Sequence, residues 1–367
     1  MSHSVNRSSL PWLFSGPLDL FAFAGSTLIA ILLLIVGAVF GWIDQDTPGW
    51  TWVVAILLID VAHVYATGFR VYFDRSELAR RPWLYGLTPL LAFAISWAVY
   101  SESVSLFWRC LAYLAVFHFV RQQYGWVALY RRRAGETDGG GYWIDTVTIY
   151  SATLYPLAYW HCHLPREFWW FRDEDFLTIQ DFALDTIAAP IFWVAIGLYT
   201  AKTVWLGISK KHFNPGKDIV VFSTALCWYL GIITFNSDFA FTVTNVIIHG
   251  IPYMVLVYWY HRRGTDEQST RPTLSRNTAR IARFVGLLWL LAYAEELIWD
   301  RGVWHQRDWL FGSAWDLGAL EAVLVPLLAV PQITHYVLDG FIWKRHSHKR
   351  VEALASGRPA EPQEDGR

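Results

Sequence analysis

The chain is poor in charged residues and in cysteines, and each shortage excludes a class of protein. Only 17% of its 367 residues are charged, against roughly 25% in soluble domains. The three cysteines, Cys110, Cys162 and Cys227, form no CxxC pair, which argues against a disulfide framework or a CxxC redox site. Gly-rich phosphate-binding loops are also missing from the sequence.

Long apolar blocks take the place of these features. Hydrophobic residues make up 54% of the chain, which also contains 22 tryptophans. Because a bilayer core about 30 Å thick needs roughly 20 apolar residues per helix, the blocks predict an all-α, polytopic transmembrane bundle. We expect about ten helices, at 18–41, 50–73, 82–100, 104–130, 142–160, 187–208, 218–236, 239–261, 280–299 and 316–343.

Basic residues concentrate in alternate loops, which indicates the orientation because Lys and Arg favour the cytoplasmic side. With a cytoplasmic N-terminus, the outer loops hold four of the 30 basic residues: Arg166, Arg172, Arg301 and Arg307. We therefore predict that both termini are cytoplasmic and that the chain is a multi-pass protein of the cell (inner) membrane. The expected divisions are an N-terminal segment at 1–17, one membrane domain at 18–345 and a disordered tail at 346–367.

Four predicted helices carry polar residues at helical spacing, although polar groups are costly in hydrocarbon. Residues three or four apart share one helix face, so each helix turns a polar stripe inward. Each stripe contains one histidine. The stripes are Asp60, His63, Thr67 and Arg70; His118, Arg121, Gln122 and Gly125; Thr242, Asn245, His249 and Tyr253; and Gln332, His335 and Asp339.

The four histidines are expected at a common depth. Counted from the first cytoplasmic charge at 1.5 Å per residue, His63 lies about 16 Å deep, His118 and His249 about 19 Å, and His335 about 13 Å. The four helices run in the same direction, so their inward side chains can meet near the midplane of the bilayer.

Neutral imidazoles that meet at one buried point predict a divalent metal site. Imidazole suits iron, copper, zinc and nickel, whereas added carboxylates favour iron or manganese, so we expect iron, in one or two ions. Asp60 and Asp339, each one turn from a histidine, are expected either to bind the metal or to orient that histidine. The predicted ligands are His63, His118, His249 and His335.

Neighbouring residues add expectations about the substrate. Arg121, Gln122 and Tyr124 are predicted to position its polar end, and Arg121 is expected to pair with Asp60, Asp339 or a lipid anion. Gly250 and Pro252 are expected to break the helix after His249, as are Pro326 and Pro331 before His335. No large cleft is expected, so the substrate is predicted to enter from the bilayer.

Two other groups are weaker candidates. His161, Cys162 and His163 lie at the outer interface without a fourth ligand, and we predict no metal there. Glu295 and Glu296 are expected to pair with Arg109 or Arg301, or else to form a second polar site.

The chain contains neither the HxxxH nor the HxxHH cluster of the membrane diiron desaturases and hydroxylases. In having single histidines on separate helices it resembles the bacterial membrane β-carotene dioxygenases, in which scattered histidines hold one iron. The resemblance is one of arrangement and assigns no residue.

These patterns predict a membrane non-haem iron enzyme, an O₂-dependent oxidoreductase that acts on a lipid or isoprenoid. An unidentified electron donor is an expected partner, and no nucleic acid is expected. Two alternatives stay open: a proton- or ion-coupled transporter with broken helices, and a haem-binding electron-transfer protein with paired histidines.

Overall fold

The structure, a computed structural model, describes residues 10–44, 47–179, 184–266, 274–344 and 349–357. All ten predicted segments are helical, and the described residues contain no strand. The first span, Gly16–Phe40, comprises α1 (Gly16–Asp19), η1 (Leu20–Gly25) and α2 (Ser26–Phe40). The second, Gly49–Tyr72, comprises α3 (Gly49–Thr51), η2 (Trp52–Val61), α4 (Ala62–Thr67) and η3 (Gly68–Tyr72).

The remaining long helices follow the predicted order. They are α6 (Pro82–Glu102), α7 (Val104–Arg133), α8 (Gly139–Cys162), α9 (Leu184–Lys210), α10 (Pro215–Trp228) with η4 (Tyr229–Thr234), α11 (Asp238–Asp266), α12 (Leu274–Trp299), and η6 (Gly318–Leu320) with α14 (Glu321–Leu328) and α15 (Val330–Ile342). Short helices connect or end them: α5 (Arg75–Arg80), η5 (Asp300–Trp304), α13 (Asp308–Phe311) and α16 (Lys349–Ser356).

Eight of the long helices are apolar enough to cross a membrane. The helices α8 and α12 are of similar length but do not meet the same criterion of apolar composition. The chain is thus a multi-pass helical membrane protein, as predicted.

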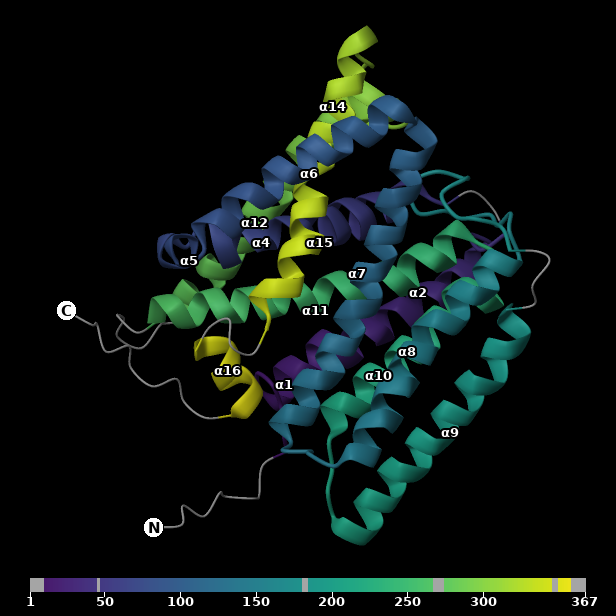
Figure 1. Ribbon diagram of the computed structural model, residues 1–367, viewed down its shortest axis with the longest axis vertical. Helices are drawn as coiled ribbons and strands as arrows, with labels where there is room; N and C mark the ends of the chain where they lie inside the picture. The colour runs from purple at the N-terminus through teal and green to yellow at the C-terminus, as the bar shows by residue number, and fades with distance from the viewer. Residues whose placement is uncertain (1–9, 45–46, 180–183, 267–273, 345–348, 358–367) are drawn as a thin grey trace.

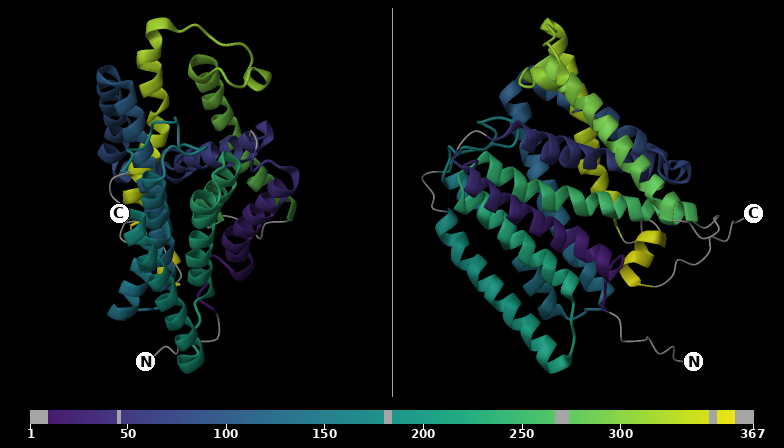
Figure 2. Two further views of the ribbon diagram at one scale, coloured as in Figure 1. Left: turned by 90° about the vertical axis from the view of Figure 1, so that its right-hand side faces the viewer. Right: turned by 180° about the vertical axis from the view of Figure 1, so that it is seen from behind.

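The helices form two groups on either side of α7 and α11 (Figure 1). On one side lie α8, α9 and α10, and on the other α6, α12, α14 and α15; Figure 2 shows the same arrangement from two further directions. The central position of α7 and α11 places residues from both groups around them, and this is where the site forms.

The predicted disordered tail contains a helix. In α16, Val351, Leu354 and Ala355 recur at three- and four-residue spacing and are buried, which is the pattern of an amphipathic helix. Leu354 packs in one apolar cluster with Leu13 and Tyr130. The prediction of disorder is therefore wrong for this segment; 345–348 and 358–367 lie outside the described residues.

The N-terminal segment is anchored at the same end of the bundle. The backbone N–H groups of Leu13, Phe14 and Ser15 donate to the Asp19 carboxylate, each at 2.9 Å, and Tyr130 donates to the same carboxylate. Both described chain ends thus meet the same end of α7, the one predicted to be cytoplasmic, which agrees with termini on one side of the bundle.

Prolines affect the two site helices differently. We expected a break after His249, but α11 continues through Pro252, so that expectation is wrong. Proline removes only one backbone donor, and a side chain stabilises the helix nearby: Gln122 Nε2 donates to the carbonyl of His249 at 2.9 Å. The tenth span is interrupted, as predicted, because α14 ends at Leu328 and α15 begins at Val330.

Gly250 lets α11 lie against the second span. A Cβ at this position would lie 2.6 Å from Ile59 Cγ2 and 3.1 Å from the Ile59 carbonyl oxygen. Only a residue without a side chain permits this approach, and the approach brings His249 next to His63.

We expect Gly250→Ala to destabilise the protein by about 1–3 kcal/mol, since the added methyl group overpacks a helix contact. Thermal unfolding in detergent measures the effect. Gly125→Ala on α7 is the matched control, because its Cβ would meet nothing within 4 Å and alanine favours helix by about 1 kcal/mol. Equal melting temperatures for the two variants would contradict the packing role of Gly250.

Candidate metal centre

Four helices each contribute one buried histidine to a single cluster. His63 lies on α4, His118 on α7, His249 on α11 and His335 on α15. Their exposed fractions are 1%, 4%, 0% and 1%. All four predicted ligands therefore meet inside the bundle, as the depth count predicted.

The four imidazole rings form a closed quadrilateral. Centroid separations along its sides are 4.7 Å from His63 to His249, 5.1 Å from His249 to His118, 4.6 Å from His118 to His335 and 4.9 Å from His335 to His63. The diagonal from His63 to His118 measures 6.4 Å. Each ring thus contacts two others, as rings that share a central ion would.

The nitrogen positions match metal ligation. The Nε2 atoms of His63 and His249 lie 3.1 Å apart. Two nitrogens bound to one ion at about 2.0–2.1 Å and cis or tetrahedral angles lie about 2.8–3.4 Å apart. Nε2 of His118 and Nε2 of His335 are buried without a hydrogen-bond partner. Buried polar atoms are normally satisfied, so these orphaned acceptors indicate a bound group.

Carboxylates and a hydroxyl lie on the opposite ring edges. Asp60 Oδ1 is 3.5 Å from Nδ1 of His63, and Thr67 Oγ1 is 2.7 Å from Nδ1 of His335. Asp339 lies 3.9 Å from Nδ1 of His118 and 3.8 Å from Nδ1 of His335. Partners on Nδ1 direct Nε2 towards a metal, as second-shell groups do in zinc and iron sites.

Two overlapping triads are suited to hold an ion. One consists of His63, His118 and His249, and the other of His118, His335 and Asp339; within each, one potential ligand atom per residue lies within 4.8 Å of the others. Because Asp339 belongs to a triad and also faces Nδ1 atoms, it is suited to either predicted role. Tyr253 restrains it by donating to Oδ1 at 2.6 Å.

Aromatic rings shield the cluster. Phe119 lies parallel to the His249 ring at 3.5 Å, with an interplanar angle of 7°, and Tyr336 stacks on His118 at 4.8 Å. These contacts fix two ring orientations and exclude water from one side of the cluster.

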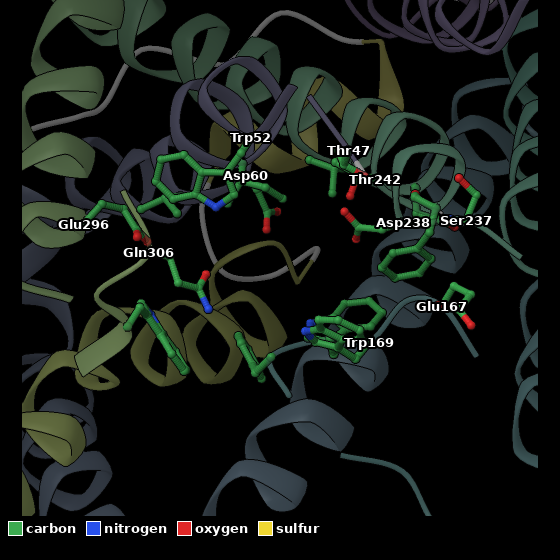
Figure 3. A pocket seen from close by; sticks show the side chains of 18 of the residues that line it. Thr47, Trp52, Asp60, Glu167, Trp169, Ser237, Asp238, Thr242, Glu296 and Gln306 are labelled. Carbon is green, nitrogen blue, oxygen red and sulfur yellow. Dashed lines mark hydrogen bonds between the residues drawn. The ribbon is translucent and has the colours of Figure 1, made fainter. Parts of the chain in front are cut away.

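A cavity of about 700 Å³ lies between the predicted outer side and the cluster, and none of the four histidines lines it (Figure 3). Its lining includes Thr47, Glu167, Ser237 and Gln306, which come from four different outer connections. The expectation that no large cleft exists is therefore wrong. Sequence patterns miss this cavity because its walls come from loops far apart in the chain.

The inner end of the cavity consists of residues that contact the histidines. Asp60, Phe119 and Tyr336 all line it, and they contact His63, His249 and His118 respectively. A molecule in the cavity would therefore lie one side chain away from three of the four rings.

The predicted substrate-positioning residues do not line this cavity. Arg121 is exposed and donates to the Tyr150 hydroxyl on α8, and its guanidinium lies 4.9 Å from the Tyr124 ring. The expected pairing of Arg121 with Asp60 or Asp339 is thus wrong. Gln122 alone of the three contacts the cluster, through the His249 carbonyl, which makes it a positioning residue for α11.

The weaker candidates also have partners. His161 is held by the Leu157 carbonyl at 2.7 Å and the Tyr113 hydroxyl at 2.8 Å, so both of its ring nitrogens have hydrogen-bond partners. Glu295 accepts from Trp299 Nε1 at 3.1 Å instead of pairing with a predicted arginine. Arg109 instead donates to the Glu174 carbonyl and Arg301 to that of Ser313, so the predicted pairings are wrong. Glu296 lines the cavity.

The chain matches no known protein-family model, no curated protein and no solved structure. The functional argument therefore depends on the cluster and its cavity.

Proposed function

We propose that the protein is a membrane metalloenzyme, an O₂-dependent non-haem iron oxidoreductase that acts on a lipid or isoprenoid substrate. The observation that carries the proposal is the closed quadrilateral of four buried histidines with two orphaned Nε2 atoms. Imidazole with supporting carboxylate is a ligand set suited to iron, and iron, when bound, would supply the redox chemistry.

The residues of the chain would perform three tasks in this reaction. Asp60, Thr67 and Asp339 would hold the Nδ1 protons, which keeps Nε2 available as a ligand. Phe119 and Tyr336 would exclude water on the cavity side, and low local polarity strengthens the electrostatic interactions inside the site. The cavity would admit the substrate.

A haem site fits the cluster less well. The rings of His249 and His335 lie 4.6–5.1 Å from those of His63 and His118, so they occupy the space between this diagonal pair that a porphyrin would need. An ion pathway is the second candidate, favoured by Asp60 and Glu296 in the wall of a cavity that ends one side chain away from the cluster.

Metal analysis of the purified chain tests the proposal. We expect about one or two iron ions per chain after purification in mild detergent, no Soret band, and O₂ uptake that begins on addition of a reductant and a membrane lipid extract. Protein that binds no metal, even after incubation with Fe²⁺, would rule out the enzyme and favour the ion pathway. A strong Soret band would indicate haem.

A further inference from the structure

The wall of the outer cavity combines two kinds of side chain. Ten of its 28 lining residues are aromatic, five are acidic and one, Arg307, is basic. Acidic side chains therefore outnumber basic ones in the lining by five to one. A cleft lined by one sign of charge concentrates ligands of the opposite sign. The acidic residues are Asp44, Asp60, Glu167, Asp238 and Glu296.

A buried acceptor in the wall has no donor. Asn245 is 2% exposed and lines the cavity. Its Nδ2 donates to the Phe241 carbonyl at 3.0 Å and to Thr244 Oγ1 at 3.1 Å, while its Oδ1 accepts no hydrogen bond. A buried acceptor without a hydrogen bond is costly in free energy, so a ligand here must bring N–H or O–H groups.

The aromatic rings add a preference for organic cations. Faces of Trp, Tyr and Phe attract cations, and aromatic cages are a recurrent means of binding ammonium groups. The protein already shows this contact at the cavity wall, where the Arg307 guanidinium lies 3.9 Å from the Trp52 ring. Figure 3 shows Asp60 and Glu296 beside Trp52, with Trp169 across the cavity. A bare metal ion would leave most of the aromatic surface unused.

We propose that this cavity binds an organic ammonium group that retains N–H donors, entering from the outer face of the membrane. The carboxylates of Asp60 and Glu296 and the Oδ1 of Asn245 accept from the ammonium group, and the aromatic wall covers the attached carbon chain. The inference deepens the proposed function, because it takes the bound molecule to be the substrate delivered to the histidine cluster. Two sources share this chemistry: a free alkylamine, and a lipid with a primary ammonium headgroup.

Binding of n-hexylammonium to the full-length protein in phosphatidylglycerol nanodiscs tests the proposal. We expect saturable binding by calorimetry, at least tenfold weaker binding of the neutral analogue 1-hexanol, and weaker binding at high salt. Equal binding of hexanol and hexylammonium would overturn the proposal.

Variants locate the site. We expect Glu296→Gln to weaken hexylammonium binding at least tenfold. The control is Glu321→Gln, which should leave this binding unchanged. Glu321 is an outer acidic residue that accepts a hydrogen bond from Tyr100 and lies outside the cavity lining. If Glu296→Gln does not fold, Asp238→Asn at the exposed mouth serves instead and is also expected to weaken binding. Binding unaffected by whichever cavity variant folds would overturn the proposal.

Lipid retention separates the two sources. Native mass spectrometry after purification from mixed phosphatidylethanolamine, phosphatidylcholine and phosphatidylglycerol should show preferential retention of phosphatidylethanolamine if the ammonium belongs to a lipid. Hexylammonium binding without lipid preference indicates a free amine, and preferential retention of phosphatidylglycerol contradicts the proposal.

Each measurement is made with and without bound metal. If the protein binds metal but not hexylammonium, this inference fails and the proposed metalloenzyme stands. If it binds hexylammonium but no metal, the proposed metalloenzyme fails and the ammonium site stands.

Discussion

Replacing His118 with alanine should abolish metal binding. His118 belongs to both potential metal-binding triads, so its loss removes a ligand from each. Changes to residues that merely orient a ligand already cost about 10–100-fold in metal affinity, and loss of a direct ligand should cost at least about a hundredfold. The measurement is iron content after dialysis against graded free Fe²⁺.

Thermal unfolding distinguishes a lost ligand from a lost fold. A ligand at a hundred times its Kd stabilises a protein by about 2.7 kcal/mol, so the wild type should melt at a higher temperature with Fe²⁺ than without it. His118→Ala should melt at the same temperature as the metal-free wild type, and Fe²⁺ should no longer raise its melting temperature.

The matched control is His161→Ala, which removes a histidine from α8 whose ring nitrogens already have partners. It should bind as much iron as the wild type. Wild-type iron content in His118→Ala would mean that the cluster is a hydrogen-bonded contact between helices instead of a metal centre.

The histidine cluster could be predicted from the sequence because helices have a constant rise and period. His63, His118, His249 and His335 are each the one histidine of a polar stripe, at similar depth in long apolar segments, and few placements of such residues avoid lipid. The same reasoning identified Asp60 and Asp339, which lie one helical turn from a histidine.

The partner of Arg121 could not be predicted from helical periodicity. At about 100° per residue, Arg121 and Gln122 lie on opposite sides of the direction in which His118 points. Gln122 turns towards α11 and bonds the His249 carbonyl, whereas Arg121 turns towards α8 and bonds Tyr150. Periodicity defines the face but not the identity of the helix beside it, so the two residues looked equivalent.

The cavity could not be predicted for a related reason. Glu167, Ser237 and Gln306 come from separate loops, and loop conformation has no periodic signature. The helix α16 was not predicted, because a two-turn amphipathic segment among polar residues is hard to distinguish from a disordered tail by its sequence. Its burial depends on contacts with α7 and the N-terminal segment.

The largest loss of stability should come from Asp145→Ala. Asp145 is fully buried on α8 and accepts from Arg131 of α7, Lys202 of α9 and, at 3.1 Å, Lys217 of α10. Removing the carboxylate leaves three cations around one fewer anion, and breaking a buried ion pair in this way costs about 3–5 kcal/mol. Thermal or denaturant unfolding in detergent measures the loss.

Two further variants make this result specific to buried charge. Glu352→Ala removes an exposed carboxylate 3.6 Å from Arg132, and exposed pairs contribute at most about 1 kcal/mol, so it should melt close to the wild type. Adding Lys202→Met to Asp145→Ala should recover part of the lost stability, because the second change removes one of the uncompensated cations. A loss in Asp145→Ala no larger than in Glu352→Ala, or a double variant less stable than Asp145→Ala, would show that the cations find water or other anions, and that this network does not hold the four helices together.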